Sequence, residues 1–135
     1  MVVNARYRVN FFDTDTMGVV HHSNYIRWFE LGRVAFMRAA QVSLNEMMDE
    51  GIVFPITEVE CRYHSPGYFD DMLVIEVTPK ALTKAKMEFD YRIMREETGE
   101  LLVTGHTQNV FTSKETGKII RIPDKYQDKL KVMLY

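Results

Sequence analysis

Residues 10–33, NFFDTDTMGVVHHSNYIRWFELGR, carry the chain from a short strand into its only long helical run, and this transition decides the fold. Before the stretch, apolar and polar residues alternate over residues 6–11, which predicts a strand with one buried face. Residues 13–18 are rich in Asp and Thr and end in glycine, as is typical of a turn. The first N–H groups of a helix are unpaired and its dipole favours negative charge, so such a turn can support buried polar chemistry. The sequence therefore predicts a functional site here.

The long helix is expected to begin near Tyr25, with Ser23 or Asn24 as its N-terminal cap. Its polar residues recur at near-helical spacing over residues 27–45, and the residues between them are mostly apolar or aromatic. Such a helix exposes only a narrow stripe. A sheet that curves around the helix would cover the rest of its surface.

A second helix is predicted from Ser43, because the sequence SLNE has the pattern of a capping box. The long helix should therefore break near residue 42, and the second helix should end before Gly51, which suits a C-terminal cap. Gly32 lies in the middle of the long helix, where glycine costs stability. Its presence predicts a close approach to another backbone.

Four further strands are indicated by alternating apolar and polar side chains, and polar, Gly- or Pro-containing turns join them. A short amphipathic helix opens at Pro123. Neighbouring strands that are joined by tight turns favour an antiparallel sheet with its helix on one face. The predicted fold class is α+β, with a curved antiparallel five-stranded sheet around a long central helix. The four strands are expected at residues 54–64, 73–79, 84–93 and 101–112.

Length and composition predict one globular domain, residues 1–135, with a single core. The formal net charge of -2 gives no reason to expect a nucleic-acid or membrane surface. The single cysteine, Cys61, rules out an internal disulfide and reads as a small buried residue. Because no signal peptide and no transmembrane-length apolar run is visible, the expected compartment is the cytoplasm.

Asp15 is the leading catalytic candidate, because a carboxylate can serve as a general base for water or attack an acyl carbon directly. From spacing alone, a turn or cap role is the better interpretation of Asp15, and Asp13 is the purer turn-former. No P-loop, dinucleotide fingerprint, GxSxG elbow or CxxC pair is present. Nucleotide hydrolysis, hydride transfer and serine-hydrolase chemistry therefore lack support.

His22 could orient a substrate, and its backbone N–H could donate to a developing oxyanion. The commoner interpretation of any one such histidine is a partly exposed residue without a role. A metal site formed by Asp13, Asp15, His21 and His22 is disfavoured, because no HxxxH or HExxH spacing holds such ligands on one face.

Several other polar residues allow both a structural and a ligand-binding role. Glu30 and Arg33 are expected to pair on the helix surface. Lys84 and Lys86 could meet a phosphate but more often such residues form a solvated face. Ligand contacts are conceivable for Arg62, His64, His106 and Asn109.

Together these residues give the chain a resemblance to a known family. The motifs DTD at 13–15, GVV at 18–20, His22 and NY at 24–25, followed by WFE at 28–30 and Arg33, resemble the signature of the 4-hydroxybenzoyl-CoA thioesterase-like hotdog proteins. The nearest subgroup is the short acyl-CoA thioesterases associated with the Tol-Pal system. The resemblance continues through residues 63–66, 71–73, 84–93, 99–105 and 121–123. It implies a hotdog fold, in which a five-stranded antiparallel sheet wraps a long helix.

The resemblance also implies an activity, the hydrolysis of a fatty or aromatic acyl-CoA to free acid and CoA. The family's catalytic Asp maps onto Asp15, and the helix N-terminal N–H that polarises the thioester carbonyl maps onto His22. No metal and no cofactor beyond the CoA of the substrate is implied. Family members form homodimers that often pair into homotetramers, with active sites at the dimer interface. The substrate-binding candidates are Gly18, Val19, Tyr25, Arg62, Lys84 and Lys86, of which the basic residues would lie near the CoA phosphates.

Phe11 is one departure from the subgroup, whose members often place a tyrosine four residues before the catalytic Asp. The acyl chain is expected in an apolar pocket beside the helix, near Tyr25, Phe29 or Phe54. Two alternatives stay open: a non-catalytic acyl-CoA binding or sensing module, and a hotdog hydroxyacyl dehydratase. The sequence does not choose between a general-base and a nucleophilic role for Asp15, and it does not set the acyl-chain preference.

Overall fold

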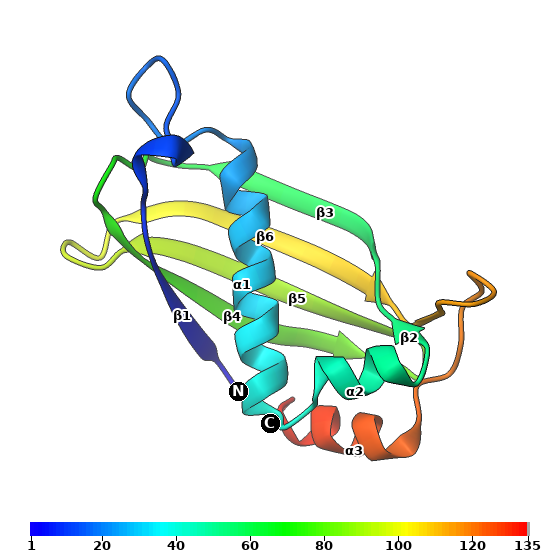
Figure 1. Cartoon of the computed structure of the whole chain (residues 1–135). Coiled ribbons are helices and arrows are strands. Elements are labelled where there is room, and N and C mark those ends of the chain that lie inside the picture. Colours follow the sequence, from blue (N-terminus) through cyan, green and yellow to red (C-terminus); the bar gives the residue numbers. More distant parts are fainter. Residues whose placement is uncertain (135) are drawn as a thin grey trace.

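A long helix, α1 (Ser23–Ala39), lies across one face of a five-stranded antiparallel sheet in the computed structural model, which describes residues 1–134 (Figure 1). The strand order is β1-β4-β5-β6-β3, so the first strand and the third form the two edges. This arrangement confirms the predicted α+β fold. The strands are β1 (Val3–Arg8), β3 (Ile56–Tyr63), β4 (Met72–Leu82), β5 (Lys86–Arg95) and β6 (Leu101–Val110).

The core lies between α1 and the inner face of the sheet, most of it on the interior strands β4 and β5. Alternate residues of β4 and β5 point inward and are buried, as the two-residue alternation predicted. On α1, Phe29 and Phe36 are fully buried, and Phe29 stacks on Tyr91 with ring centroids 4.3 Å apart. The inward residues are Leu73, Ile75 and Val77 on β4 and Met87, Phe89, Tyr91 and Ile93 on β5.

Gly32 is a point of close approach between α1 and the sheet. A methyl group at this position would lie 2.3 Å from Cγ2 of Val77 and 3.1 Å from Cγ2 of Ile75. The predicted close approach is therefore present, but the neighbours are side chains of β4 and not another backbone. Only glycine lets the helix approach this near without displacing core side chains.

The break after α1 and the start of α2 (Leu44–Asp49) follow the prediction. The Ser43 hydroxyl accepts a hydrogen bond from the Glu46 N–H at 3.1 Å, and Gly51 follows the helix with φ 76°. The chain then adds β2 (Ile52–Val53), which pairs with β7 (Thr112–Ser113) in a separate two-stranded sheet.

The structure corrects the predicted boundaries at the start of the chain. The first strand ends at Arg8, and residues 11–13 form a short 3-10 helix, η1 (Phe11–Asp13), so Phe11 is 76% exposed and not part of the buried strand face. The N-cap position of α1 is His22, where Ser23 or Asn24 was predicted. The Asn24 side chain is instead buried and donates to the Asp13 carbonyl at 2.8 Å.

The later strands differ from the prediction in several places. The strand predicted at residues 84–93 is β5 and begins two residues later, at Lys86, so Lys84 lies in the preceding turn. The edge strand β3 exposes nearly all its residues, so it has no buried alternate face in the single chain. The strand β4 continues past Pro79 to Leu82. Its pairing with β5 shifts register between Pro79 and Ala81, and such an irregularity accommodates a proline, which has no N–H to donate to the neighbouring strand. The last long strand divides into β6 and β7.

The chain ends in α3 (Asp124–Val132), which begins directly after Pro123 as predicted. Its apolar face packs into the core through Tyr126 and Leu130. Across residues 1–134, none of the helices is both long and apolar enough to cross a membrane.

Candidate active site

Asp13 anchors the turn that precedes α1. Its Oδ2 atom accepts hydrogen bonds from the Tyr7 hydroxyl and the Asn10 N–H, both at 2.8 Å. Its carbonyl oxygen accepts from the His21 N–H at 2.9 Å and from the Asn24 amide. Asp13 is 5% exposed, and its oxygen atoms accept hydrogen bonds that hold the turn in place. This position confirms the turn-forming role predicted for Asp13.

Asp15 lies in the tight loop that follows, and its backbone is fixed on both sides. Its N–H donates to the Val19 carbonyl at 2.8 Å, and its carbonyl accepts from the Gly18 N–H at 3.0 Å. Gly18 has φ 79°, a left-handed conformation that a side chain would strain. The Asp15 Oδ1 atom accepts from the Met17 N–H at 2.8 Å. The other carboxylate oxygen, Oδ2, has no hydrogen-bond partner among the described residues.

His22 places its backbone at the N-terminus of α1. In the part of the chain that the structure describes, no acceptor is found for the His22 N–H. The imidazole ring is exposed and stacks on His21 with ring centroids 4.2 Å apart. The Tyr63 hydroxyl donates to the His22 carbonyl at 2.9 Å, which ties the end of β3 to the helix start.

A cavity of about 330 Å³ brings the two candidate catalytic residues together. Among the predicted substrate-binding residues, Val19 and Tyr25 also line it, whereas Gly18 shapes the loop without lining the cavity. The cavity therefore presents a carboxylate and a helix N-terminus to one space, with aromatic walls. Its lining consists of Asp15, Val19, Val20, His22, Tyr25, Tyr63, His64, Ser65 and Pro66.

The three predicted basic residues do not line this cavity. Arg62 lies on the exposed edge strand β3. Lys86 pairs with Val110 at one end of β6, while the cavity adjoins the other end, where Leu102 accepts from the His64 N–H. Eight residues of strand separate the two ends, roughly 26 Å. Lys84, in the turn before β5, lies at the same far end, so a single chain does not bring the two lysines to Asp15.

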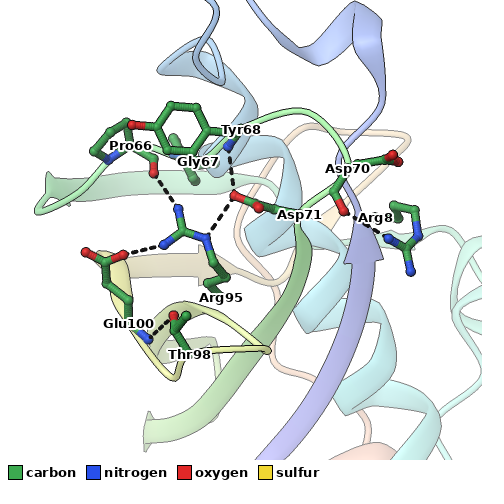
Figure 2. Close-up of polar contacts among 10 residues, drawn as sticks. Arg8, Pro66, Gly67, Tyr68, Asp70, Asp71, Arg95, Thr98 and Glu100 are labelled. Carbon is green, nitrogen blue, oxygen red and sulfur yellow. Dashed lines mark hydrogen bonds and ion pairs between the residues drawn. The ribbon is translucent and has the colours of Figure 1, made fainter.

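Within the wall formed by residues 63–66, His64 alone was a ligand-contact candidate from the residues, and it does line the cavity. Figure 2 shows how Arg95 holds the adjoining loop. Its Nη2 donates to the Pro66 carbonyl at 2.9 Å, and its Nε donates to Asp71 Oδ2 at 3.0 Å. The guanidinium also forms an ion pair with Glu100. The sequence signals for the rest of this wall were a strand that ends in a Ser-Pro-Gly turn and the family resemblance over residues 63–66.

Tyrosine side chains form the aromatic wall of the cavity. Burial raises the pKa of Tyr25, whose hydroxyl accepts a hydrogen bond from the Gly67 N–H at 3.0 Å. Partial burial and the neighbouring Cys61 raise the pKa of Tyr63 to about 12. Both phenols therefore stay protonated at neutral pH, and Tyr63 keeps donating to the His22 carbonyl.

A second, larger cavity of about 610 Å³ lies beside α1, between α2 and the start of β3. Phe54 lines it, as expected for an apolar pocket next to the helix. Phe29 is fully buried between α1 and the sheet and lines neither cavity. The predicted Glu30–Arg33 pair does not form. Arg33 is buried and donates from Nη1 to the Tyr91 hydroxyl at 3.2 Å, because its side chain points to the sheet.

Other candidates from the sequence have structural partners. His106 contacts Asp90 Oδ1 at 2.7 Å on the outer face of the sheet and lines neither cavity. Phe11 packs edge-on against Phe69, with ring centroids 5.8 Å apart, and does not line the Asp15 cavity. Residues 1–134 contain no group of three or more His, Cys, Asp or Glu side chains placed to hold a metal ion.

Comparison with known proteins places this geometry in a family. Residues 9–130 match the family described as the thioesterase-like superfamily. A protein of Aquifex aeolicus (strain VF5) is 31% identical over 126 residues, covering 93% of this chain and 95% of its own length. An acyl-CoA thioester hydrolase of Escherichia coli O157:H7 is 31% identical over 67% of each chain. The crystal structure of a DHNA-CoA thioesterase from Staphylococcus aureus superposes with a TM-score of 0.91 at 27% identity, covering 97% of this chain and 90% of that one.

Proposed function

The chain belongs to the thioesterase-like superfamily, and we propose that it is an acyl-CoA thioesterase in which Asp15 and the His22 N–H carry the reaction. The observation that supports this proposal most strongly is their convergence on one cavity. The names of the curated relatives support the reaction class, since the Escherichia coli relative is an acyl-CoA thioester hydrolase. In this proposal the reaction requires neither a metal nor a resident cofactor.

Asp15 is the group that moves the proton or attacks the thioester. One carboxylate oxygen is held by the Met17 N–H, so the side chain is oriented. The free Oδ2 can take a proton from water as the water attacks the carbonyl carbon. It can also attack that carbon itself, forming a mixed anhydride that water then hydrolyses. In both routes the C–S bond breaks, the sulfur leaves as CoA thiolate, and the acid product keeps the new oxygen.

The backbone N–H of His22 is the proposed oxyanion donor. Negative charge develops on the thioester oxygen as the carbonyl carbon becomes tetrahedral, and an unpaired N–H at a helix N-terminus stabilises that charge. The peptide that carries this N–H is held through its carbonyl, because the His21 carbonyl accepts a hydrogen bond from the Asn24 N–H at 3.0 Å. The Tyr63 hydroxyl holds the following peptide through the His22 carbonyl. Because this donor is already oriented before substrate binds, little reorganisation is needed in the transition state.

A homodimer formed along β3 would complete the site. The strand is an exposed edge with apolar side chains, among which Val59 is 43% exposed, and such edges pair readily with another strand. An antiparallel pair of β3 strands brings Ile56 of one copy toward Tyr63 of the other. It thereby carries the lysine-bearing end of one sheet, with Lys84 and Lys86, toward the Asp15 cavity of its partner. This supports a CoA phosphate contact made across the interface.

The test is thiol release from short-chain, long-chain and aromatic acyl-CoAs by wild type and Asp15→Asn. We expect turnover on at least one substrate class, and a loss of about 10²–10⁴-fold in kcat for the variant with KM kept within a few-fold. Asp49→Asn, an exposed carboxyl at the end of α2, is the matched control and should retain activity.

Measuring acyl-CoA binding and enoyl-CoA formation beside thiol release separates the two rival functions. A binding or sensing module would bind acyl-CoA tightly and release no thiol. A dehydratase would form enoyl-CoA from a hydroxyacyl-CoA without free thiol. Full thiol release by Asp15→Asn would overturn the role proposed for Asp15.

A further inference from the structure

His21 holds the start of α1 through both its backbone and its ring, although it lines neither cavity. Its N–H donates to the Asp13 carbonyl at 2.9 Å, and its carbonyl accepts from the Asn24 N–H at 3.0 Å. The ring nitrogen Nδ1 accepts from the Ser23 N–H at 3.2 Å. This one residue therefore connects the turn at Asp13 to two of the first N–H groups of the helix.

The contact between the His21 ring and Ser23 requires a neutral imidazole. A backbone N–H can donate to Nδ1 only when that nitrogen carries a lone pair, which assigns the ring hydrogen to Nε2. The Ser23 hydroxyl lies 2.8 Å from the same nitrogen and donates to it in this form. In the imidazolium, Nδ1 also carries a hydrogen and faces the Ser23 N–H as a second donor. Protonation therefore breaks the hold of the ring on the Ser23 backbone.

These contacts decide which N–H groups at the start of α1 are available to a substrate. The N–H groups of Ser23 and Asn24 both donate to His21, whereas the His22 N–H has no acceptor among the described residues. The His21 carbonyl and the His22 N–H belong to one planar trans peptide, so they point in opposite directions. Because the carbonyl is engaged by Asn24, the N–H points away from the body of the helix. His21 thus leaves one free donor and fixes its direction.

The His21 ring is also coupled to its titratable neighbours. It stacks on the His22 ring with centroids 4.2 Å apart, and Tyr63 from β3 meets the far side of this pair edge-on, 6.4 Å from the His22 ring. Asp15 shares its cavity with His22 and Tyr63, and the Asp13 carboxylate is occupied by donors of its own turn. Two stacked imidazoles repel each other when both are charged. A proton on the His21 ring therefore disturbs the stack as well as the contact with the helix.

We propose that His21 is a positioning residue for the oxyanion donor: its neutral ring keeps the His22 N–H in the productive direction, and its protonation lowers turnover. A hydrogen-bond donor stabilises developing charge best when its direction is fixed before the reaction. Once the ring releases Ser23, the peptides at the helix start are held less firmly. The inference rests on the proposed thioesterase function and adds to it a residue that acts through His22 without touching the substrate.

The experiment compares steady-state thiol release by wild type, His21→Ala and His21→Asn. Alanine removes the acceptor of the Ser23 N–H. Asparagine keeps an acceptor, because its side-chain oxygen bonds readily to the N–H two residues further along, and it carries no titrating group. Near pH 8 we expect His21→Ala to lower kcat about tenfold with KM kept within a few-fold, since the donor is misdirected and not removed. His21→Asn should restore kcat to within about threefold of wild type.

The pH profile of kcat gives a readout that a merely structural role would not move. Wild-type kcat should fall as the pH drops through the range in which histidine side chains titrate, about pH 6–7. In His21→Asn this fall should shift toward the range of carboxyl groups, about pH 4. His106→Gln is the matched control, because it removes a histidine from the outer face of the sheet, away from both cavities. It should keep the wild-type profile.

A measurement without substrate keeps the outcome decisive. In wild type, the NMR shift of the Ser23 amide proton should titrate together with the His21 ring, and His21→Asn should lose most of that change. Failure of the thioesterase proposal therefore stays distinct, and His21→Asn alone carries the test if His21→Ala does not fold. A Ser23 amide that does not follow the His21 ring would overturn the inference. So would a fall in kcat near pH 6–7 that survives His21→Asn or moves only in His22→Asn, or a kcat that rises as the pH drops through this range.

Discussion

Arg95 donates a hydrogen bond from Nη2 to the carbonyl oxygen of Pro66 at 2.9 Å, and so joins the end of β5 to the wall of the Asp15 cavity (Figure 2). The same guanidinium pairs with Asp71 at 3.0 Å, and that carboxylate accepts from the Tyr68 N–H at 2.9 Å. Both ends of the 66–71 loop therefore depend on one side chain. The loop in turn contacts the segment that follows Asp15, since the Gly67 carbonyl accepts a hydrogen bond from the Val20 N–H at 2.8 Å.

Arg95→Met should loosen this loop and weaken substrate binding more than it slows chemistry. The Asp71 carboxylate would lose its cation in a partly buried site, and the expected destabilisation is about 1–3 kcal/mol. We expect a rise in KM of several-fold with a smaller change in kcat, measured by steady-state thiol release and denaturant unfolding. Arg92→Met is the control, because Arg92 lies on the same strand with an exposed side chain. Equal effects of the two substitutions would contradict this role for Arg95.

Asp13 and Asp15 should respond oppositely to the same chemical change. The Asp13 carboxylate is buried and holds Tyr7 and Asn10, so Asp13→Asn should cost about 1–3 kcal/mol of stability, seen as a lower Tm. Asp15→Asn should leave Tm nearly unchanged and remove turnover. If Asp13→Asn were stable and inactive while Asp15→Asn stayed active, the catalytic role would belong to Asp13 and the turn role to Asp15.

The local sequence pattern was enough to predict features that depend on neighbouring residues, such as the buried face of a strand. Leu73, Ile75 and Val77 alternate with polar neighbours, and the structure buries them because one sheet face packs on α1. Asp15 and His22 are seven residues apart across one turn, so their proximity follows from local geometry. The catalytic roles predicted for them were candidates from the residues, but spacing alone favoured a turn role for Asp15 and no role for His22. The family resemblance moved the prediction to catalysis.

Features that depend on contacts between distant parts of the chain could not be predicted from the sequence. Tyr63 reaches His22 from forty-one residues away, and no local pattern encodes that register. The Glu30–Arg33 spacing suits a helix-surface pair, but the rotation of α1 buries Arg33 against Tyr91 instead. The far-end position of Lys86 depends on the strand order, which brings β3 beside β6 and not beside β4.

His106 should make stability depend on pH. Its Nδ1 and Nε2 lie 2.7 Å from Asp90 Oδ1 and 3.1 Å from Glu88 Oε1, and the hydrogen bond to Asp90 is the main cause that raises the pKa of His106. A pKa raised in the folded state adds stability below the unfolded value of about 6.5, and this is lost as pH rises through the folded pKa.

The Tm difference between wild type and His106→Gln should therefore be larger near pH 6 than near pH 9, as scanning calorimetry can measure. Asp90→Asn removes the main partner of His106. When both proteins carry Asp90→Asn, the Tm difference caused by His106→Gln should be smaller near pH 6. A difference that grows toward the higher pH would show that the neutral imidazole is the stabilising form.

If two copies of the chain pair along the edge of β3, Val59→Lys should leave the chain folded but lower its activity. Val59 is half-exposed in the single chain, so lysine there costs the isolated fold little, while a lysine on a pairing edge opposes strand addition. We expect wild type to sediment as a dimer or larger and the variant as a folded monomer. Thiol release should fall with dissociation, because Lys84 and Lys86 reach the Asp15 cavity only from a second copy.

Glu76→Lys, on the outer face of β4, is the control that should keep both assembly and activity. A monomeric Val59→Lys protein with full turnover would place the whole reaction within one chain.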